Sequence, residues 1–117
     1  MPRSEAGYLP DLLRGNTESL LLFEINEQGN TYGYRLIKEI EKKSQGFFHF
    51  KEGTVYPALR KLENESLIKG EWQELPSGQK RRYYQITEAG KEVLRKKIAA
   101  WQGFTDAVNL ILKPSKA

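Results

Sequence analysis

Two groups of polar side chains in the middle of this 117-residue chain have the chemistry needed to contact a nucleic acid. The first group combines hydroxyl, guanidinium, ammonium and amide side chains, in Thr54, Arg60, Lys61 and Asn64. The second group is the basic run of Lys80, Arg81 and Arg82. Guanidinium and ammonium groups bind phosphate, and guanidinium and amide groups also form hydrogen bonds with base edges. These residue types therefore indicate recognition rather than catalysis.

The first group lies on a segment whose apolar spacing predicts a helix from about Gly53 to Ile68. Val55, Leu59 and Leu62 follow the i, i+4, i+7 spacing of one helical face. The polar residues of the first group then occupy the opposite face. Taken alone, this pattern is also typical of any surface helix with a solvated outer side. The elements around the helix must decide between the two interpretations.

The flanking segments predict a helix-turn-helix followed by two strands. A first helix is expected from about Pro10 to a cap at Gly29, and Thr31 is a candidate cap for a second helix. Branched and aromatic residues predict strands at 67–75 and 79–86, joined by a Pro-Ser-Gly turn. This order is that of a winged helix-turn-helix domain, so we predict a mainly α fold with a small β-hairpin.

The turn between the two strands is the expected wing, and the basic run lies directly beside it. Lys80, Arg81 and Arg82 place three positive charges there, and Tyr83 and Tyr84 put one ring on each face of the strand. A charged edge strand also protects a sheet against unwanted pairing, which is the plain alternative. With a presented helix next to it, the cluster favours contact with DNA.

The last part of the chain predicts one long helix with a broad apolar stripe. Thr87 is its expected cap and Pro114 limits it, which gives about 26 residues or roughly 40 Å. The stripe consists of Leu94, Ile98, Trp101, Phe104, Val108, Ile111 and Leu112. Such spacing is typical of a helix that packs against a partner helix. We therefore expect a homodimer, with a flexible arm at 1–9, the winged DNA-binding domain at 10–86 and the dimerisation helix at 87–117.

Composition excludes several classes of function. The chain has 19 basic and 15 acidic residues, a net charge of +4 and a pI near 9.3, which favours anionic partners. It contains no cysteine, and its one histidine, His49, lies between two phenylalanines. The longest apolar run, Leu20 to Phe23, is too short for a membrane span. We expect a soluble cytoplasmic protein that uses no cofactor or metal and is not an enzyme.

Three segments stand out by their order and spacing: YGYRLIKEI at 32–40, GTVYPALRKLENESLI at 53–68 and RRYYQITEAG at 81–90. Together they resemble the PadR family of bacterial transcription regulators, over about residues 12–112. The short C-terminal part is similar to the subfamily that includes the multidrug-responsive repressor LmrR. The resemblance implies a ligand-responsive repressor that binds double-stranded operator DNA. The DNA contacts that it implies are at Tyr34, Thr54, Tyr56, Arg60, Lys61, Lys80, Arg81 and Arg82.

Trp101 raises the question of a ligand site on the last helix. Gly103 stands close to it, and glycine in a helix interior costs about 1 kcal/mol relative to alanine. It indicates either a close backbone approach or space beside the tryptophan. From spacing alone, Trp101 is expected to fill the interface between two helices. The resemblance instead implies a pore in which paired tryptophans bind a planar aromatic effector, with Trp101, Phe104 and Val108 as the ligand-binding residues.

Two other classes of function compete with DNA binding. A winged-helix adaptor could use the same fold and the same long helix for protein interaction alone, without touching DNA. Such an adaptor has no need for a basic cluster at Lys80, Arg81 and Arg82 next to a presented helix. A small enzyme has little support, because the titratable residues form no recognisable set of nucleophile and base.

Overall fold

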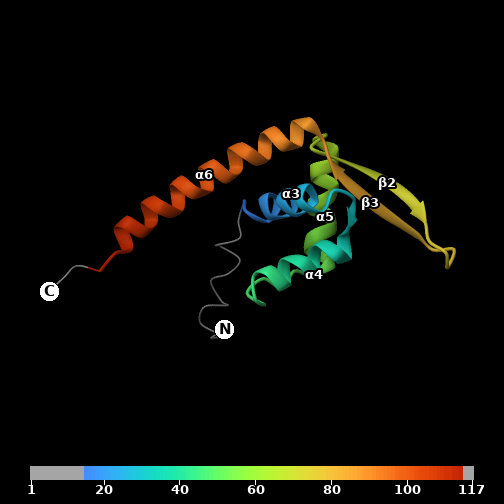
Figure 1. Cartoon of the computed structure of the whole chain (residues 1–117), viewed down its shortest axis with the longest axis horizontal. Coiled ribbons are helices and arrows are strands. Elements are labelled where there is room, and N and C mark those ends of the chain that lie inside the picture. The colour runs from blue at the N-terminus through green and yellow to red at the C-terminus, as the bar shows by residue number, and fades with distance from the viewer. Residues whose placement is uncertain (1–14, 115–117) are drawn as a thin grey trace.

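The computed structural model describes residues 15–114, in which a helical core carries a small sheet and one projecting helix (Figure 1). The elements in chain order are α3 (Thr17–Gln28), β1 (Thr31–Tyr32), α4 (Gly33–Lys43), α5 (Glu52–Asn64), β2 (Ile68–Glu74), β3 (Lys80–Ile86) and α6 (Glu88–Leu112). The predicted mainly α fold with a small hairpin is confirmed. The arm predicted at 1–9 and the helix start predicted near Pro10 lie outside the described residues; α3 begins at Thr17.

Helices α3, α4 and α5 pack around one apolar core. Each contributes three buried aliphatic side chains: Leu21, Leu22 and Ile25; Leu36, Ile37 and Ile40; and Val55, Leu59 and Leu62. Burial of each such side chain contributes about 1.5–3 kcal/mol. The stripe predicted on α5 is therefore confirmed, with all three residues at most 1% exposed. Because this stripe fixes the rotation of α5 about its own axis, the opposite face of the helix is held toward solvent.

The sheet has three antiparallel strands in the order β1-β3-β2, so the predicted hairpin has a third member. Thr31 pairs with Tyr84 and is completely buried, and its hydroxyl donates a hydrogen bond to Gln28 Oε1. The prediction that Thr31 caps the second helix is therefore wrong. The residue before α4 is Tyr32, which makes no side-chain cap hydrogen bond. A strand of two residues is too short to show a periodic pattern, while threonine before a helix resembles a cap.

Helix α6 begins as the sequence predicts and then leaves the core. Thr87 Oγ1 accepts a hydrogen bond from the backbone N–H of Gly90 at 3.0 Å, which confirms the cap. Gly90 and Leu94 are the buried residues of the helix, both near its start. Val93 and Ile98 also pack against the core, and beyond them α6 projects away from the other elements (Figure 1). The helix ends at Leu112, close to the predicted limit at Pro114.

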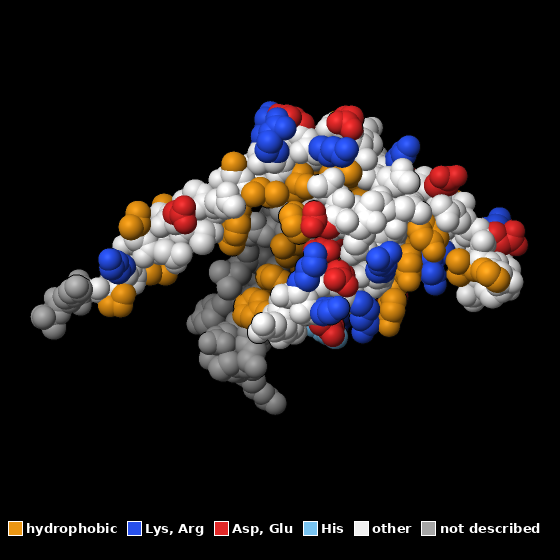
Figure 2. Space-filling model, viewed as in Figure 1, with side chains coloured by type: hydrophobic (Ala, Val, Ile, Leu, Met, Phe, Trp, Pro, Cys, Tyr) orange, Lys and Arg blue, Asp and Glu red, His pale blue; other side chains and the backbone are white. Residues whose placement is uncertain are grey.

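The projecting part of α6 carries apolar side chains that the described chain does not cover, as Figure 2 shows. Leu110, Ile111 and Leu112 are 76%, 80% and 70% exposed.

Within residues 15–114, none of the helices has the length and hydropathy needed to cross a membrane.

Candidate nucleic-acid interface

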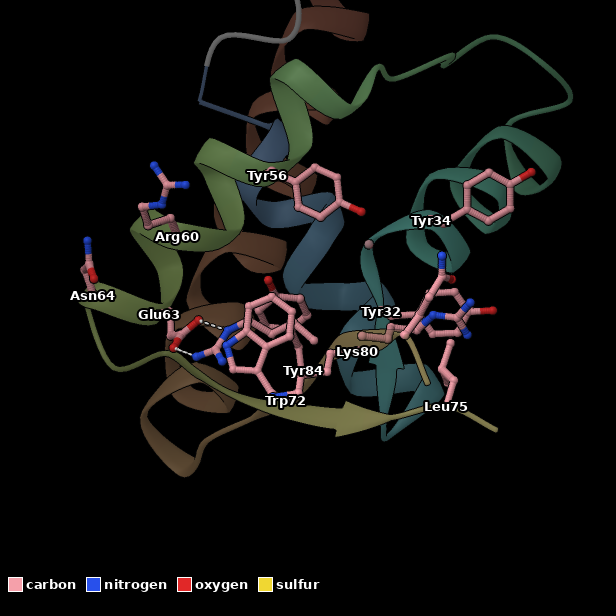
Figure 3. Close-up of a pocket in the computed structure, with 14 residues that line it drawn as sticks. Tyr32, Tyr34, Tyr56, Arg60, Glu63, Asn64, Trp72, Leu75, Lys80 and Tyr84 are labelled. Atoms are coloured by element: carbon pink, nitrogen blue, oxygen red, sulfur yellow. Dashed lines mark hydrogen bonds and ion pairs between the residues drawn. The ribbon is translucent and has the colours of Figure 1, made fainter. Parts of the chain in front are cut away.

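A groove of 580 Å³ lies between α5, the start of α4 and the β2–β3 hairpin, which we call the wing. We call this hollow the α5–wing groove (Figure 3). From α5 it is lined by Tyr56, Arg60, Glu63 and Asn64, and from the wing by Trp72, Leu75, Gln79, Lys80, Arg81, Arg82 and Tyr84. Tyr32, Gly33 and Tyr34 complete its wall. The structure thus brings together most of the residues predicted to contact DNA.

The polar face predicted on α5 is exposed along its length: Thr54, Arg60, Lys61 and Asn64 all face solvent. Arg60 and Asn64 line the α5–wing groove, whereas Thr54 and Lys61 do not. Lys61 Nζ lies 3.2 Å from Glu18 Oε1, so it links α5 to α3. Among the described residues, the Arg60 side chain forms neither an ion pair nor a hydrogen bond. Its guanidinium is therefore available to an external ligand.

The ring of Tyr56 lies close to Gly33 at the start of α4, where the absence of a side chain leaves room for it. Figure 3 shows its ring projecting from α5 toward α4, and a Cβ atom at Gly33 would lie 2.7 Å from Tyr56 Cε1. Burial raises the pKa of the Tyr56 hydroxyl, and the nearby carboxylate of Glu52 raises that pKa further. Tyr34, one residue after the glycine, is 54% exposed, with the Lys38 ammonium 5.4 Å from its ring centre. Both phenols thus lie at the α4 side of the groove.

Lys80 and Arg81, the first two cations of the wing, differ in their contacts with the rest of the protein. Lys80 is exposed and makes no ion pair with the described residues. The Arg81 guanidinium lies 4.0 Å from the centre of the Tyr32 ring and donates a long hydrogen bond of 3.5 Å to the Tyr83 hydroxyl. That hydrogen bond is the main reason why the pKa of Arg81 is raised. Tyr32 packs edge-on against Tyr83, with ring centres 5.4 Å apart. This contact set fixes Arg81 against β1 at one side of the groove.

Arg82 has an intramolecular partner that the sequence did not reveal. Its guanidinium forms two hydrogen bonds with the carboxylate of Glu63 on α5, drawn as dashed lines in Figure 3. The Trp72 ring centre lies 5.4 Å from the same guanidinium. The hydrogen bond to Glu63 is the main cause of the raised pKa of Arg82. Glu63 and Arg82 are 19 residues apart, so no local spacing could have paired them.

A second hollow, with a volume of 480 Å³, lies where α6 passes α3 and the segment between α4 and α5. Its apolar wall includes Leu20, Phe23, Phe47, Phe48, Ile98 and Trp101. Phe104 stacks on Trp101, with ring centres 5.9 Å apart, but neither it nor Val108 lines the hollow. At Gly103 a Cβ atom would meet nothing within 4 Å, so within the described chain the glycine stands beside open space.

Comparison with known proteins places these features in a family. The PadR-like transcriptional regulator family matches the chain over residues 21–96. Uncharacterized protein X of Lysinibacillus sphaericus is 31% identical over 103 residues, which cover 88% of this chain and 94% of that protein. The crystal structure of a PadR family transcriptional regulator from Eggerthella lenta is similar with a TM-score of 0.82 and 30% identity, over 97% of this chain and 96% of that one.

A PadR-like transcriptional regulator from Bacillus cereus is similar with a TM-score of 0.75 and 33% identity, over 90% of this chain and 99% of that one. The similarity includes the helical core, the wing and the long α6. Members of this family are transcriptional regulators and not enzymes. The closer likeness to LmrR stays a prediction. The chain itself belongs to the PadR-like family of transcriptional regulators.

Proposed function

We propose that this regulator is a ligand-responsive repressor that binds double-stranded operator DNA as a homodimer. Helix α5 enters the major groove and the wing follows the phosphate backbone. The observation that carries the proposal is the position of Arg60: its guanidinium is exposed, without an ion pair among the described residues, and lies in the same hollow as Lys80. A base-reading group and a phosphate-binding group thus share one surface.

The predicted site residues take different parts in this proposal. Arg60 and Asn64 have the donors and acceptors to read base edges, whereas Lys80 and Arg81 bind phosphate. Lys61 also binds phosphate, because an exposed ion pair such as that with Glu18 is worth at most about 1 kcal/mol and exchanges easily. The hydroxyl groups of Thr54, Tyr56 and Tyr34 contact the sugar-phosphate backbone of the DNA beside its major groove.

Selection of bound sequences from a random DNA pool, followed by binding titrations at several salt concentrations, tests the proposal. Arg60→Ala is expected to lose about 1–3 kcal/mol on the preferred site and to relax the preference at one base position. Lys80→Ala is expected to weaken binding to all sequences and to lower the log–log salt slope by about 0.9. Lys96→Ala on α6 removes the same charge away from the groove and serves as the control.

The adaptor without DNA binding makes the opposite prediction. If the pool yields no enriched sequence and the protein shows no salt-dependent affinity for duplex DNA, the regulator acts through protein contacts instead. The clustering of Arg60, Lys80 and Arg81 around one hollow favours DNA, because contacts from Lys and Arg to phosphate supply much of the affinity of a protein for duplex DNA.

The ligand response is supported by the hollow beside α6. A volume of 480 Å³ suits a drug-sized molecule, and the aromatic rings of Phe23, Phe47, Phe48 and Trp101 suit a planar aromatic one. We place Trp101 at the ligand itself, with Phe104 stacked behind it and Val108 further along α6 toward the partner protomer. Each ring would contribute stacking contact beyond its buried area.

Tryptophan fluorescence tests this ligand site. Bicyclic and tricyclic aromatic compounds are titrated into the wild type and into Trp101→Ala, in which Trp72 is the remaining tryptophan and serves as the internal control. Quenching is expected in the wild type and should disappear in the variant. If quenching is the same in both proteins, the compound binds near Trp72, and the site beside α6 must be rejected.

A further inference from the structure

We propose that Glu63 and Arg82 form a clamp that sets the position of the wing relative to α5, so that Arg82 is a positioning residue and not a phosphate ligand. The inference rests on the proposed DNA binding, in which Arg82 would otherwise count as the third cation of the wing. It assigns a role to Glu63, an acidic residue on a surface that must accept an anion.

The clamp is a two-point contact between two elements. Arg82 Nε donates to Glu63 Oε1 at 3.2 Å, and Arg82 Nη2 donates to Glu63 Oε2. The side chains are 25% and 29% exposed, so water competes less than at the open surface. A bidentate pair of this kind fixes both distance and orientation, because the guanidinium and the carboxylate must stay coplanar. It therefore restrains rotation of the wing about β3.

Strand β2 encloses the same guanidinium from another side. A Cβ atom at Gly70 would lie 2.6 Å from Arg82 Nε, so the arginine passes through space that any other residue would fill. Trp72 lies opposite Arg82 in the strand register, and its ring faces the guanidinium with the centre 5.4 Å away. A cation over an aromatic ring gains about 0.5–1 kcal/mol at an exposed site. Glu63, Gly70 and Trp72 together hold Arg82 away from solvent.

The wing needs such a restraint because the third strand ends early. β1 pairs with β3 at Tyr83 and Tyr84, whereas β2 and β3 continue together to Glu74 and Lys80. From Arg82 outward the wing is thus a two-stranded ribbon, and isolated ribbons are marginally stable. Arg82 is the first residue past β1, so its pair with Glu63 extends the anchoring of the hairpin beyond the three-stranded part of the sheet. Lys80, further out and exposed, is free to contact phosphate.

The two roles for Arg82 predict opposite effects of Glu63→Gln on DNA affinity. If Arg82 binds phosphate, removal of the carboxylate frees the guanidinium and removes a repelling charge, so DNA binding strengthens. If the pair is a clamp, the wing loses its position and binding weakens, by about tenfold if one charge-assisted hydrogen bond is lost. Glu65→Gln is the matched control, since it removes an exposed carboxylate from the end of the same helix.

Arg82→Lys is a second test that distinguishes a clamp from a phosphate ligand, and it keeps the positive charge. A lysine retains a phosphate contact but cannot form the bidentate pair. If the pair is a clamp, Arg82→Lys binds DNA more weakly and the log–log salt slope stays unchanged. Arg82→Gln also loses affinity. Its salt slope does not fall by the value of about 0.9 that the loss of a phosphate contact gives. Tighter binding by Glu63→Gln, or a full slope decrease in Arg82→Gln, would overturn the proposal.

A measurement without DNA keeps the clamp separate from the proposed function. In a Trp101→Phe background Trp72 is the remaining tryptophan. Glu63→Gln and Arg82→Lys are then expected to change its emission, because the guanidinium leaves the ring, whereas Glu65→Gln leaves the emission unchanged. Unchanged Trp72 emission in all three proteins rejects the clamp. If the wild type binds no duplex DNA, the proposed function fails while this test of the clamp still stands.

Discussion

Tyr84 is the most deeply buried ring of the α5–wing groove, and it links the chemistry of the groove to the stability of the fold. The residue is 5% exposed and lies on β3, opposite Thr31. Burial raises the pKa of its hydroxyl, and the neighbouring Arg82 opposes that rise without cancelling it. The folded protein therefore holds Tyr84 as the neutral phenol.

This raised pKa predicts a loss of stability at alkaline pH. Because the folded-state pKa of Tyr84 exceeds the unfolded value near 10, its contribution is fully present below that value and is lost as pH rises through the folded pKa. Between about pH 9 and pH 12, the free energy of unfolding is expected to fall less for Tyr84→Phe than for the wild type. Urea denaturation at each pH measures this, with Tyr34→Phe as the control for an exposed phenol. An equal loss in Tyr84→Phe and the wild type would contradict the prediction.

The residues of the groove differ in how far the sequence could predict them. Arg60 and Asn64 were placed correctly on the exposed face of α5, because helical periodicity relates each residue to its neighbours a few positions away. The pair of Glu63 with Arg82 and the contact of Arg81 with Tyr32 depend on the register of the wing against a distant helix and strand. Local spacing holds no information about that register.

At the scale of elements, the start of α6 and the end of the wing meet at Gly90. A Cβ atom there would lie 2.0 Å from the carbonyl oxygen of Leu67 and 2.7 Å from Ile86 Cγ1. Thr87 strengthens this junction, since its hydroxyl also lies 2.8 Å from the carbonyl oxygen of Ser66. The start of α6 thus packs closely on the backbone just before β2 and on a side chain of β3, an approach that only glycine permits.

Two glycine replacements in α6 are expected to act in opposite directions. Gly90→Ala forces the backbone of α6 away from Leu67 and should destabilise the protein by about 3 kcal/mol or more. Gly103→Ala places a methyl group in open space within a helix and should stabilise it by about 1 kcal/mol. Thermal and urea unfolding of the two variants provide the comparison, each serving as the control for the other. Destabilisation by both would show that a partner protomer packs closely on Gly103.

The elements were predicted best where a local signal marks them. The cap at Thr87 and the limit at Pro114 bracket α6, because a hydroxyl cap and a proline act within a few residues. β1 was missed because its two residues, Thr31 and Tyr32, become a strand through pairing with β3, not through their own pattern. Tertiary pairing of this kind overrides local propensity.

The whole molecule is elongated, with extents of 65 × 32 × 20 Å, because α6 projects beyond the core. Its far end bears the large exposed residues Leu110, Ile111 and Leu112. Monomeric proteins rarely leave apolar side chains gathered in this way without a partner. Burial of the three would contribute about 1.5–3 kcal/mol each, which offsets a large part of the cost of association.

The proposed homodimer therefore depends on this end of α6. Ile111→Glu is expected to shift the protein from dimer to monomer at micromolar concentration, because a carboxylate cannot be buried there without a partner charge. The winged domain should stay folded, since Ile111 is 80% exposed in the single chain. Sedimentation equilibrium gives the mass and circular dichroism the helix content. Ala99→Glu, an exposed residue on the same helix, is the charge-matched control, and a wild type that sediments as a monomer would refute the dimer.

Helix α6 is fixed near its start by the close packing at Gly90, and its far end lies in the proposed dimer interface. A small rotation at Gly90 is therefore amplified along the helix. Its 25 residues span about 37 Å, so a tilt of about 5° at Gly90 moves the far end by about 3 Å. That displacement is close to the roughly 3.4 Å rise between successive base pairs. A small tilt of α6 can thus change the distance between the two wings of the proposed dimer, so that this distance no longer matches the spacing of two half-sites on the DNA.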